Sequence, residues 1–124
     1  MHLTLHLTRS CNMRCRYCYA PPQPCRPMSI ETLRGAMDLG VRTGDGSCGV
    51  VFFGGEPLLH KDLIREGVEY GRFLETAGRG RLHFKLTTNG LLLDDAFLEY
   101  ADSVGLIITM SFDGVRRAHD AHRL

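Results

Sequence analysis

The sequence has no excess of charge of either sign and no long apolar segment. Fifteen lysines and arginines nearly balance fourteen aspartates and glutamates, and the formal net charge is +1. A chain so close to neutral has no long-range electrostatic attraction to nucleic acid or to an anionic membrane. No apolar run approaches the ~20 residues that a membrane-spanning helix needs. The 124 residues, 44% of them hydrophobic, therefore suit one soluble domain with a buried core.

A disulfide framework is also missing. The five cysteines are an odd number, and Met1 runs directly into a strand-like segment without a signal-peptide pattern. Secreted disulfide scaffolds normally carry an even number of cysteines behind such a signal. We therefore expect a cytoplasmic protein with reduced thiols.

Three cysteines are concentrated in one run, Cys-Asn-Met-Arg-Cys-Arg-Tyr-Cys-Tyr, as Cys11, Cys15 and Cys18. A cubane iron–sulfur cluster is normally held by ~4 cysteine thiolates, so three would leave one iron free to bind a small molecule. Structural zinc sites usually combine two separated pairs of ligands, and no second pair follows here. A zinc site completed by Cys25 stays open as an alternative.

Four apolar segments alternate with three amphipathic ones. The hydrophobic pattern predicts strands at 3–8, 49–53, 82–87 and 106–111 and helices after Ser29 to about 44, at 62–76 and at 94–103. In the first helix the predicted buried stripe is Ile30, Leu33, Met37 and Val41. Strands separated by single helices are typical of right-handed βαβ units. The sequence therefore predicts an α/β fold with a parallel sheet.

Polar residues and glycines follow every predicted strand. The cysteine run follows the first strand, and the other three strands are followed by Gly54-Gly55-Glu56-Pro57, Thr88-Asn89-Gly90 and Ser111-Phe112-Asp113-Gly114. In parallel α/β folds, functional sites gather at the carboxyl ends of the strands. We therefore expect these four segments to meet at one edge of the sheet.

The Cys-x-x-x-Cys-x-x-Cys run followed by Gly-Gly-Glu-Pro resembles the radical S-adenosylmethionine (radical SAM) enzymes over essentially the whole chain. The resemblance implies the first four βα units of a partial (β/α) TIM-like barrel. It also implies a 4Fe-4S cluster on Cys11, Cys15 and Cys18, whose free iron is chelated by S-adenosylmethionine. Reductive cleavage then gives methionine and a 5′-deoxyadenosyl radical, which abstracts hydrogen from the substrate.

The same resemblance implies a set of cofactor-binding residues. It assigns the amino group of S-adenosylmethionine to Gly54, Gly55 and Glu56, the adenine to Tyr17, and the ribose to Ser111, with Asn89 positioning cofactor or substrate. By residue type alone, the glycines permit close backbone approach and Glu56 suits an ammonium partner. Each of the other three has a structural alternative: Tyr17 as a packed aromatic, Ser111 as a strand-end cap and Asn89 as a turn residue.

The segment after the fourth strand resembles one branch of this family. Ser-Phe-Asp-Gly at 111–114, with His119, Asp120 and Arg123 downstream, is similar to sulfatase-maturase and other peptide-modifying enzymes, which are usually fused to a SPASM domain with auxiliary clusters. The resemblance implies a peptide or protein substrate and a low-potential electron donor such as flavodoxin or ferredoxin.

The chain departs from that family in length. It stops after the fourth strand, so we expect residues 1–124 to be the N-terminal part of a radical SAM core domain, without the rest of the barrel or an auxiliary-cluster domain. The alternative to an enzyme is a non-catalytic metal-binding fragment, either iron–sulfur or structural zinc. Cys25 is either an exposed thiol or a fourth cysteine ligand, which would close the metal site.

Overall fold

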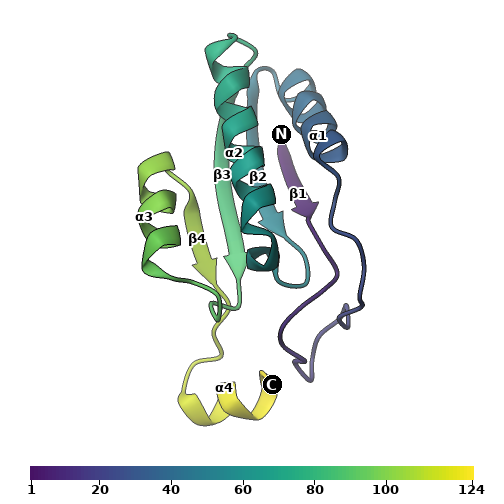
Figure 1. Cartoon of the computed structure of the whole chain (residues 1–124), viewed down its shortest axis with the longest axis vertical. Helices are drawn as coiled ribbons and strands as arrows, with labels where there is room; N and C mark the ends of the chain where they lie inside the picture. The colour runs from purple at the N-terminus through teal and green to yellow at the C-terminus, as the bar shows by residue number, and fades with distance from the viewer.

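In a computed structural model, which describes all of residues 1–124, the chain forms a four-stranded parallel sheet with helices between the strands (Figure 1). The sheet contains β1 (His2–His6), β2 (Ser47–Phe53), β3 (Arg81–Thr88) and β4 (Ile107–Met110), side by side in chain order. The helices are α1 (Ile30–Thr43), the short 3-10 helix η1 (Pro57–His60), α2 (Lys61–Thr76), α3 (Asp95–Val104) and α4 (Arg116–His122). No helix combines the length and apolarity needed to cross a bilayer.

The helix boundaries follow local signals in the sequence. At the start of α1, the Ser29 side chain accepts a hydrogen bond from the Thr32 backbone N–H at 3.1 Å, and Asp94 caps α3 in the same way. Gly105 ends α3 in the left-handed conformation, with φ of 71°. One prediction for α1 is wrong: Ile30, the first residue of the helix, is 39% exposed, whereas Leu33, Met37 and Val41 are buried.

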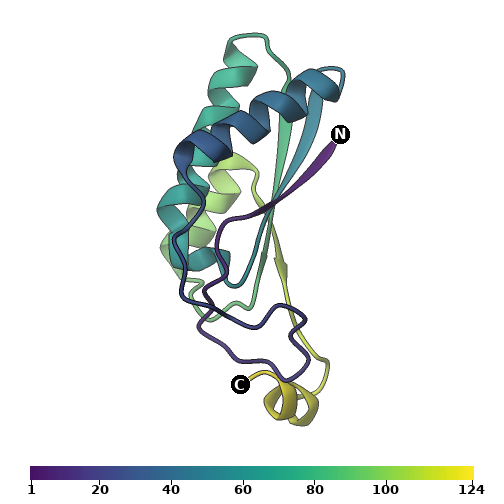
Figure 2. The ribbon, with the colours of Figure 1, turned by 90° about the vertical axis from the view of Figure 1, so that its right-hand side faces the viewer.

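The core lies between the sheet and α1, α2 and α3, which all cover the same face (Figure 2). Alternation along β3 shows this arrangement, since Phe84 and Leu86 are buried whereas His83 and Lys85 are exposed. Phe84 stacks on Phe52 of β2 with ring centroids 5.9 Å apart. Burying this apolar face is the main source of stability for such a sheet.

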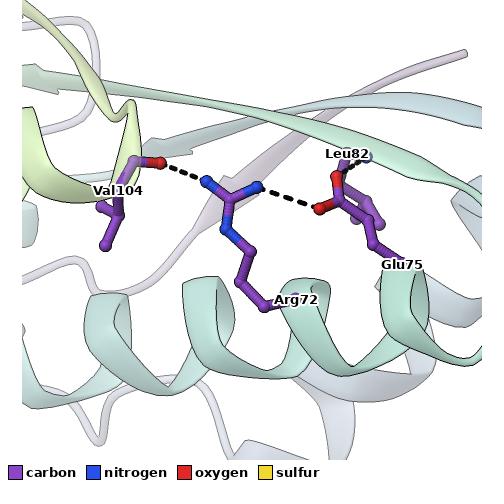
Figure 3. A network of polar contacts seen from close by, with 4 residues as sticks. All are labelled: Arg72, Glu75, Leu82 and Val104. Atoms are coloured by element: carbon purple, nitrogen blue, oxygen red, sulfur yellow. Dashed lines mark hydrogen bonds and ion pairs between the residues drawn. The ribbon is translucent and has the colours of Figure 1, made fainter.

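A polar network joins α2 to its neighbours at the surface (Figure 3). Arg72 donates to the Val104 carbonyl at the end of α3 and forms an ion pair with Glu75 at 2.9 Å. The other oxygen of Glu75 accepts a hydrogen bond from Leu82 N in β3 at 2.9 Å. Burial acts to raise the pKa of Glu75, but the bonds from Leu82 and Arg72 hold it below its ordinary value.

The strand register aligns the carboxyl ends of the four strands. His6 of β1 pairs with Phe53 of β2, and Thr88 of β3 pairs with Met110 of β4. All four arrows in Figure 1 point to the same end of the molecule. The expected meeting of the post-strand segments at one edge is therefore confirmed.

Candidate functional site

One pocket at the carboxyl edge of the sheet contains most of the predicted site. Eight of the nine predicted site residues line it: Cys11, Cys15, Tyr17, Cys18, Gly54, Gly55, Asn89 and Ser111. The same pocket includes Met13, Phe53 and Thr88. The structure thus brings together residues that lie up to 100 positions apart in the sequence. Glu56 is the predicted residue that does not line the pocket.

Cys11 lies at the start of the loop between β1 and α1. Its sulfur accepts hydrogen bonds from Met13 N at 3.4 Å and from Asn89 Nδ2 at 3.8 Å. Burial raises the pKa of the Cys11 thiol, and the negative charges of Glu56 and Cys15 act in the same direction, against the Met13 bond. A bound metal would lower this pKa, because cysteine ligates as the thiolate.

Cys15 and Cys18 occupy a tight turn of the same loop. The Cys18 N–H donates to the Cys15 carbonyl at 3.1 Å, and the Cys18 thiol donates to the Ala20 carbonyl at 3.1 Å. No three histidine, cysteine, aspartate or glutamate side chains converge on a single-ion position. All three thiols line the same pocket, and a cubane cluster takes each cysteine thiolate on a different iron.

Cys25 lies outside this pocket. Its exposed sulfur accepts a hydrogen bond from Arg9 N at 3.1 Å and lies 3.7 Å from Thr8 Oγ1. These bonds, led by the one from Arg9, lower the pKa of the Cys25 thiol. The predicted alternative in which Cys25 closes a four-cysteine site is therefore not favoured by its position.

Gly54 and Gly55 bring the β2–η1 turn into contact with the start of the cysteine loop. Gly54 has φ of 132°, and a Cβ there would lie 2.4 Å from the Thr8 carbonyl oxygen. A Cβ on Gly55 would lie 2.2 Å from the Ser10 carbonyl oxygen. Gly55 N also donates to Thr8 O at 2.8 Å. The glycines are therefore needed for close approach between two segments of this chain, beside whatever they offer a cofactor.

Glu56 is fully buried behind the pocket. Its Oε1 accepts hydrogen bonds from Leu58 N at 3.0 Å and from the Thr88 hydroxyl at 2.6 Å. Its Oε2 accepts one from Asn89 N at 2.8 Å. The carboxylate thus connects the glycine turn to the end of β3, and the predicted contact with an amino group stays a prediction.

Asn89 and Ser111 follow the third and fourth strands. Asn89 Nδ2 donates to Asn12 Oδ1 at 2.8 Å, while its Oδ1 accepts from Leu91 N at 3.0 Å. Asn89 is therefore both a turn residue and a link to the cysteine loop. Ser111 N donates to Thr88 O at 2.8 Å, which continues the β3–β4 pairing to the pocket.

Tyr17 contacts a distant segment, which no sequence pattern predicts to lie beside it. Its hydroxyl donates to Asp113 Oδ2 at 2.6 Å, and Arg123 Nε lies 3.1 Å from the same oxygen. The bond to Asp113 raises the pKa of Tyr17 to about 12. Asp113 does not cap α4, whose N-cap is Val115. Contacts across 96 residues leave no local sequence signal.

Ten of the sixteen residues that line the pocket belong to the basic part of the molecule, which we call the cysteine end and define as residues 7–28 and 111–124. It carries seven arginines and two aspartates, a formal charge of +5. The remaining residues, which we call the body, carry eight basic and twelve acidic side chains, a formal charge of −4. The near-neutral total therefore conceals a strong charge asymmetry.

Comparison with known proteins finds one family. The model described as the Radical SAM superfamily matches residues 5–123. Fe-coproporphyrin III synthase of Methanosarcina barkeri is 30% identical over 120 residues, 95% of this chain and 28% of that protein. PqqA peptide cyclase of Gluconobacter oxydans is 32% identical over 126 residues, 95% of this chain and 32% of that protein. The chain thus spans about a third of the length of these relatives.

A solved structure has the same fold. Native anSMEcpe with bound AdoMet and Kp18Cys peptide superposes with a TM-score of 0.87 at 24% identity, over 98% of this chain and 34% of that one. The predicted α/β arrangement, part of a TIM-like barrel, is confirmed by this likeness. Helices on one face of the sheet, as in Figure 2, match the outer layer of such a barrel.

Proposed function

We propose, because this chain belongs to the radical SAM superfamily, that it binds a 4Fe-4S cluster through Cys11, Cys15 and Cys18 and holds S-adenosylmethionine at the fourth iron. The observation that carries the proposal is the single pocket that contains all three thiols and the glycine turn. When bound, the two cofactors would supply radical chemistry: a reductive cleavage of S-adenosylmethionine, with one electron from an external donor, that would lead to abstraction of a hydrogen atom from the substrate.

The residues of the chain divide into ligands and supports. The three cysteines act as thiolate ligands, and the Asn89 amide, 3.8 Å from the Cys11 sulfur, donates toward one of them. Hydrogen bonds to ligand sulfurs are among the determinants of cluster potential. Gly54 and Gly55 present backbone groups to the methionine end of the cofactor. Ser111 and Tyr17, which line the same pocket, serve the ribose and adenine.

We propose a peptide or protein side chain as the substrate. Two similarities support this class: the likeness to a peptide cyclase and the fold shared with a structure that contains a peptide. The similarity to a protein named Fe-coproporphyrin III synthase means that the relatives of this chain do not all share one named substrate class. Hydrogen abstraction from a peptide side chain is thus a more specific proposal than the binding of the cluster and S-adenosylmethionine.

The proposed electron donor is a low-potential protein such as flavodoxin or ferredoxin, in a reducing compartment such as the cytoplasm. All five cysteines are free thiols, which agrees with a reducing compartment. The +5 charge of the cysteine end would attract an acidic donor to the side of the molecule where the cluster binds.

Anaerobic reconstitution with iron and sulfide tests cofactor binding. We expect about four irons per chain, from the stoichiometry of a cubane cluster, and an altered electron paramagnetic resonance spectrum of the reduced cluster when S-adenosylmethionine is added. Cys15→Ala should lose the cluster. Tight zinc binding without iron uptake would overturn the proposal.

The matched control is Cys25→Ala, which removes a thiol from the same loop but outside the pocket. We expect this variant to retain the cluster and the spectral response to S-adenosylmethionine. If Cys25→Ala instead loses the cluster, the site is closed by four cysteines. A closed site has no vacant iron for S-adenosylmethionine, and the non-catalytic alternative would then hold.

A further inference from the structure

The turn that carries Cys15 and Cys18 has little apolar support. Among residues 9–27, Met13 is the only buried residue, and Tyr17, between the two cysteines, is more than half exposed. A loop with so few buried contacts is expected to open easily unless polar contacts hold it. Polar contacts are therefore expected to fix this turn.

Three side chains form a closed set of contacts at the turn, and we call them the Tyr17 network: Tyr17, Asp113 and Arg123. Oδ2 of Asp113 accepts the Tyr17 hydroxyl proton at 2.6 Å and lies 3.1 Å from Arg123 Nε. The Arg123 guanidinium carbon lies 5.5 Å from the centre of the Tyr17 ring. Each member therefore contacts both of the others, and Asp113 is the shared acceptor.

The backbone follows the same path. Arg16 N donates to the His122 carbonyl at 2.9 Å, and Arg14 N donates to the Leu124 carbonyl. These two amides flank Cys15. Figure 2 shows the result, with α4 beside the loop at the end of the molecule away from the core. Segment 113–124 thus contacts the loop on both sides of one predicted cluster ligand and at the residue before another.

The Tyr17 network differs from ordinary surface pairing on the same segment. The side chains of Arg123 and Asp113 are 12% and 25% exposed, whereas those of Arg116 and Asp120, paired at 3.3 Å, are 93% and 62% exposed. Partly buried, charge-assisted contacts hold a geometry more firmly than exposed pairs, which contribute little. The exposed Arg116–Asp120 pair is therefore a matched control for the partly buried Arg123–Asp113 pair.

We propose that Asp113 and Arg123 are positioning residues for the cluster ligands: by holding Tyr17, they fix the Cys15–Cys18 turn in the shape that binds the cluster. This inference rests on the proposed function, since it assigns a task to residues that do not themselves ligate iron. Asp113 acts on the site only through Tyr17, and Arg123 acts through Asp113 and the Tyr17 ring.

The first test uses the chain without its cluster. We compare hydrogen exchange of the amides of residues 14–18 in the wild-type chain, Asp113→Asn and Asp120→Asn. Asp113→Asn should exchange about tenfold faster across the turn, as expected for the loss of one charge-assisted hydrogen bond. Asp120→Asn should match the wild type. Equal protection in Asp113→Asn and the wild type would overturn the proposal.

The second test measures the loss of iron from the reconstituted chain to a chelator. Asp113→Asn and Tyr17→Phe should each lose iron about tenfold faster than the wild type, and the double variant should be no faster than Asp113→Asn, because both changes remove one contact. Additive effects, or a rate in Asp113→Asn equal to that of Asp120→Asn, would overturn the proposal. Failure of the wild type to take up iron would overturn the proposed function, while the exchange experiment would still report on the Tyr17 network.

Discussion

The body and the cysteine end are held together by different forces. Eighteen of the nineteen residues of the core cluster belong to the body, and the cysteine end contributes only Leu7. The cysteine end relies instead on hydrogen bonds and ion pairs, among them the Tyr17 network. Apolar burial is strong and non-directional, whereas hydrogen bonds add little net stability but fix geometry. In this molecule the body supplies stability, and the cysteine end supplies the geometry of the site.

The largest effect should come from the body. Phe52 is fully buried and stacks on Phe84, so Phe52→Ala removes a large side chain from a closely packed core. We expect the free energy of unfolding to fall by about 3–5 kcal/mol. Urea denaturation followed by circular dichroism measures the change.

The control for Phe52→Ala is the same substitution in the cysteine end. Phe112 is 62% exposed and contacts His119 with ring centroids 5.3 Å apart. Phe112→Ala should lower the free energy of unfolding by less than about 1 kcal/mol, as is usual for surface positions. An equal loss in the two variants would show that the cysteine end also has an apolar core, which contradicts the distinction between the regions.

The second effect concerns the junction between the regions. Glu56 accepts three hydrogen bonds from the body, and its backbone N–H donates to the Ser10 carbonyl of the cysteine end at 2.9 Å. In Glu56→Gln, an amide –NH2 group replaces one of the two acceptor oxygens. At least one of the donors that bind Glu56 then faces another donor and loses its acceptor. We expect a loss of about 2–3 kcal/mol in the free energy of unfolding, measured by urea denaturation.

Glu66→Gln is the control for this junction, because Glu66 is a half-exposed carboxylate whose partner, Arg34, lies 3.5 Å away. Its loss should be below about 1 kcal/mol. If Glu56→Gln keeps full stability and only weakens binding of S-adenosylmethionine, Glu56 is a cofactor contact and not a structural link. The two measurements together therefore decide the role of Glu56.

Much of the body could be predicted from the sequence, because its elements are encoded by neighbouring residues. The four strands and three of the helices were predicted from apolar periodicity, and the N-caps Ser29 and Asp94 lie next to the helices they begin. Helix α4 was missed because it has no buried residue and hence no apolar stripe. The exposure of Ile30 was missed because periodicity assigns a residue to the apolar stripe without showing that the first residue of the helix is left partly uncovered.

In the site, too, local patterns could be predicted from the sequence and long-range contacts could not. Cysteine spacing and the Gly-Gly-Glu turn are local patterns, and the structure places the three cysteines, Gly54 and Gly55 at one pocket. The partners of Glu56 and Tyr17 depend on strand register and on the path of the chain after β4, across 32 and 96 residues. No local pattern records such contacts. The types of residue in the site were therefore predictable, but the connections among them were not.

The third effect tests the charge asymmetry. The cysteine end carries +5 and the body −4, so a double variant Arg16→Glu and Arg26→Glu should slow reduction of the cluster by an acidic flavodoxin about tenfold at low salt. The difference should shrink as ionic strength rises from about 0.01 M to about 0.15 M, because the Debye length falls from about 30 Å to about 8 Å. Stopped-flow absorbance of the cluster measures both rates.

The control for the charge asymmetry places the same charges in the body. Arg42 lies in the last turn of α1 and Arg79 follows α2, both toward the amino ends of the strands (Figure 1). Arg42→Glu with Arg79→Glu changes the net charge equally and should leave the rate nearly unchanged. Equal slowing in both double variants would show that total charge, and not its location, governs the encounter.

The smallest effect is a pH dependence within the body. The pKa of Glu75 is lowered despite its partial burial, because Leu82 N and Arg72 donate hydrogen bonds to the carboxylate. A carboxyl whose pKa is lower in the folded state adds stability above its unfolded pKa, about 4.3 for glutamate, and this stability is lost as pH falls through the folded value.

Glu75→Gln should therefore be less stable than the wild type by about 1 kcal/mol at pH 7, and the gap should narrow below about pH 4. Urea denaturation of both chains from pH 7 to pH 3 measures the gap. A gap that stays constant over this range would mean that the carboxylate charge adds nothing, and that the network in Figure 3 stabilises the body only through neutral contacts.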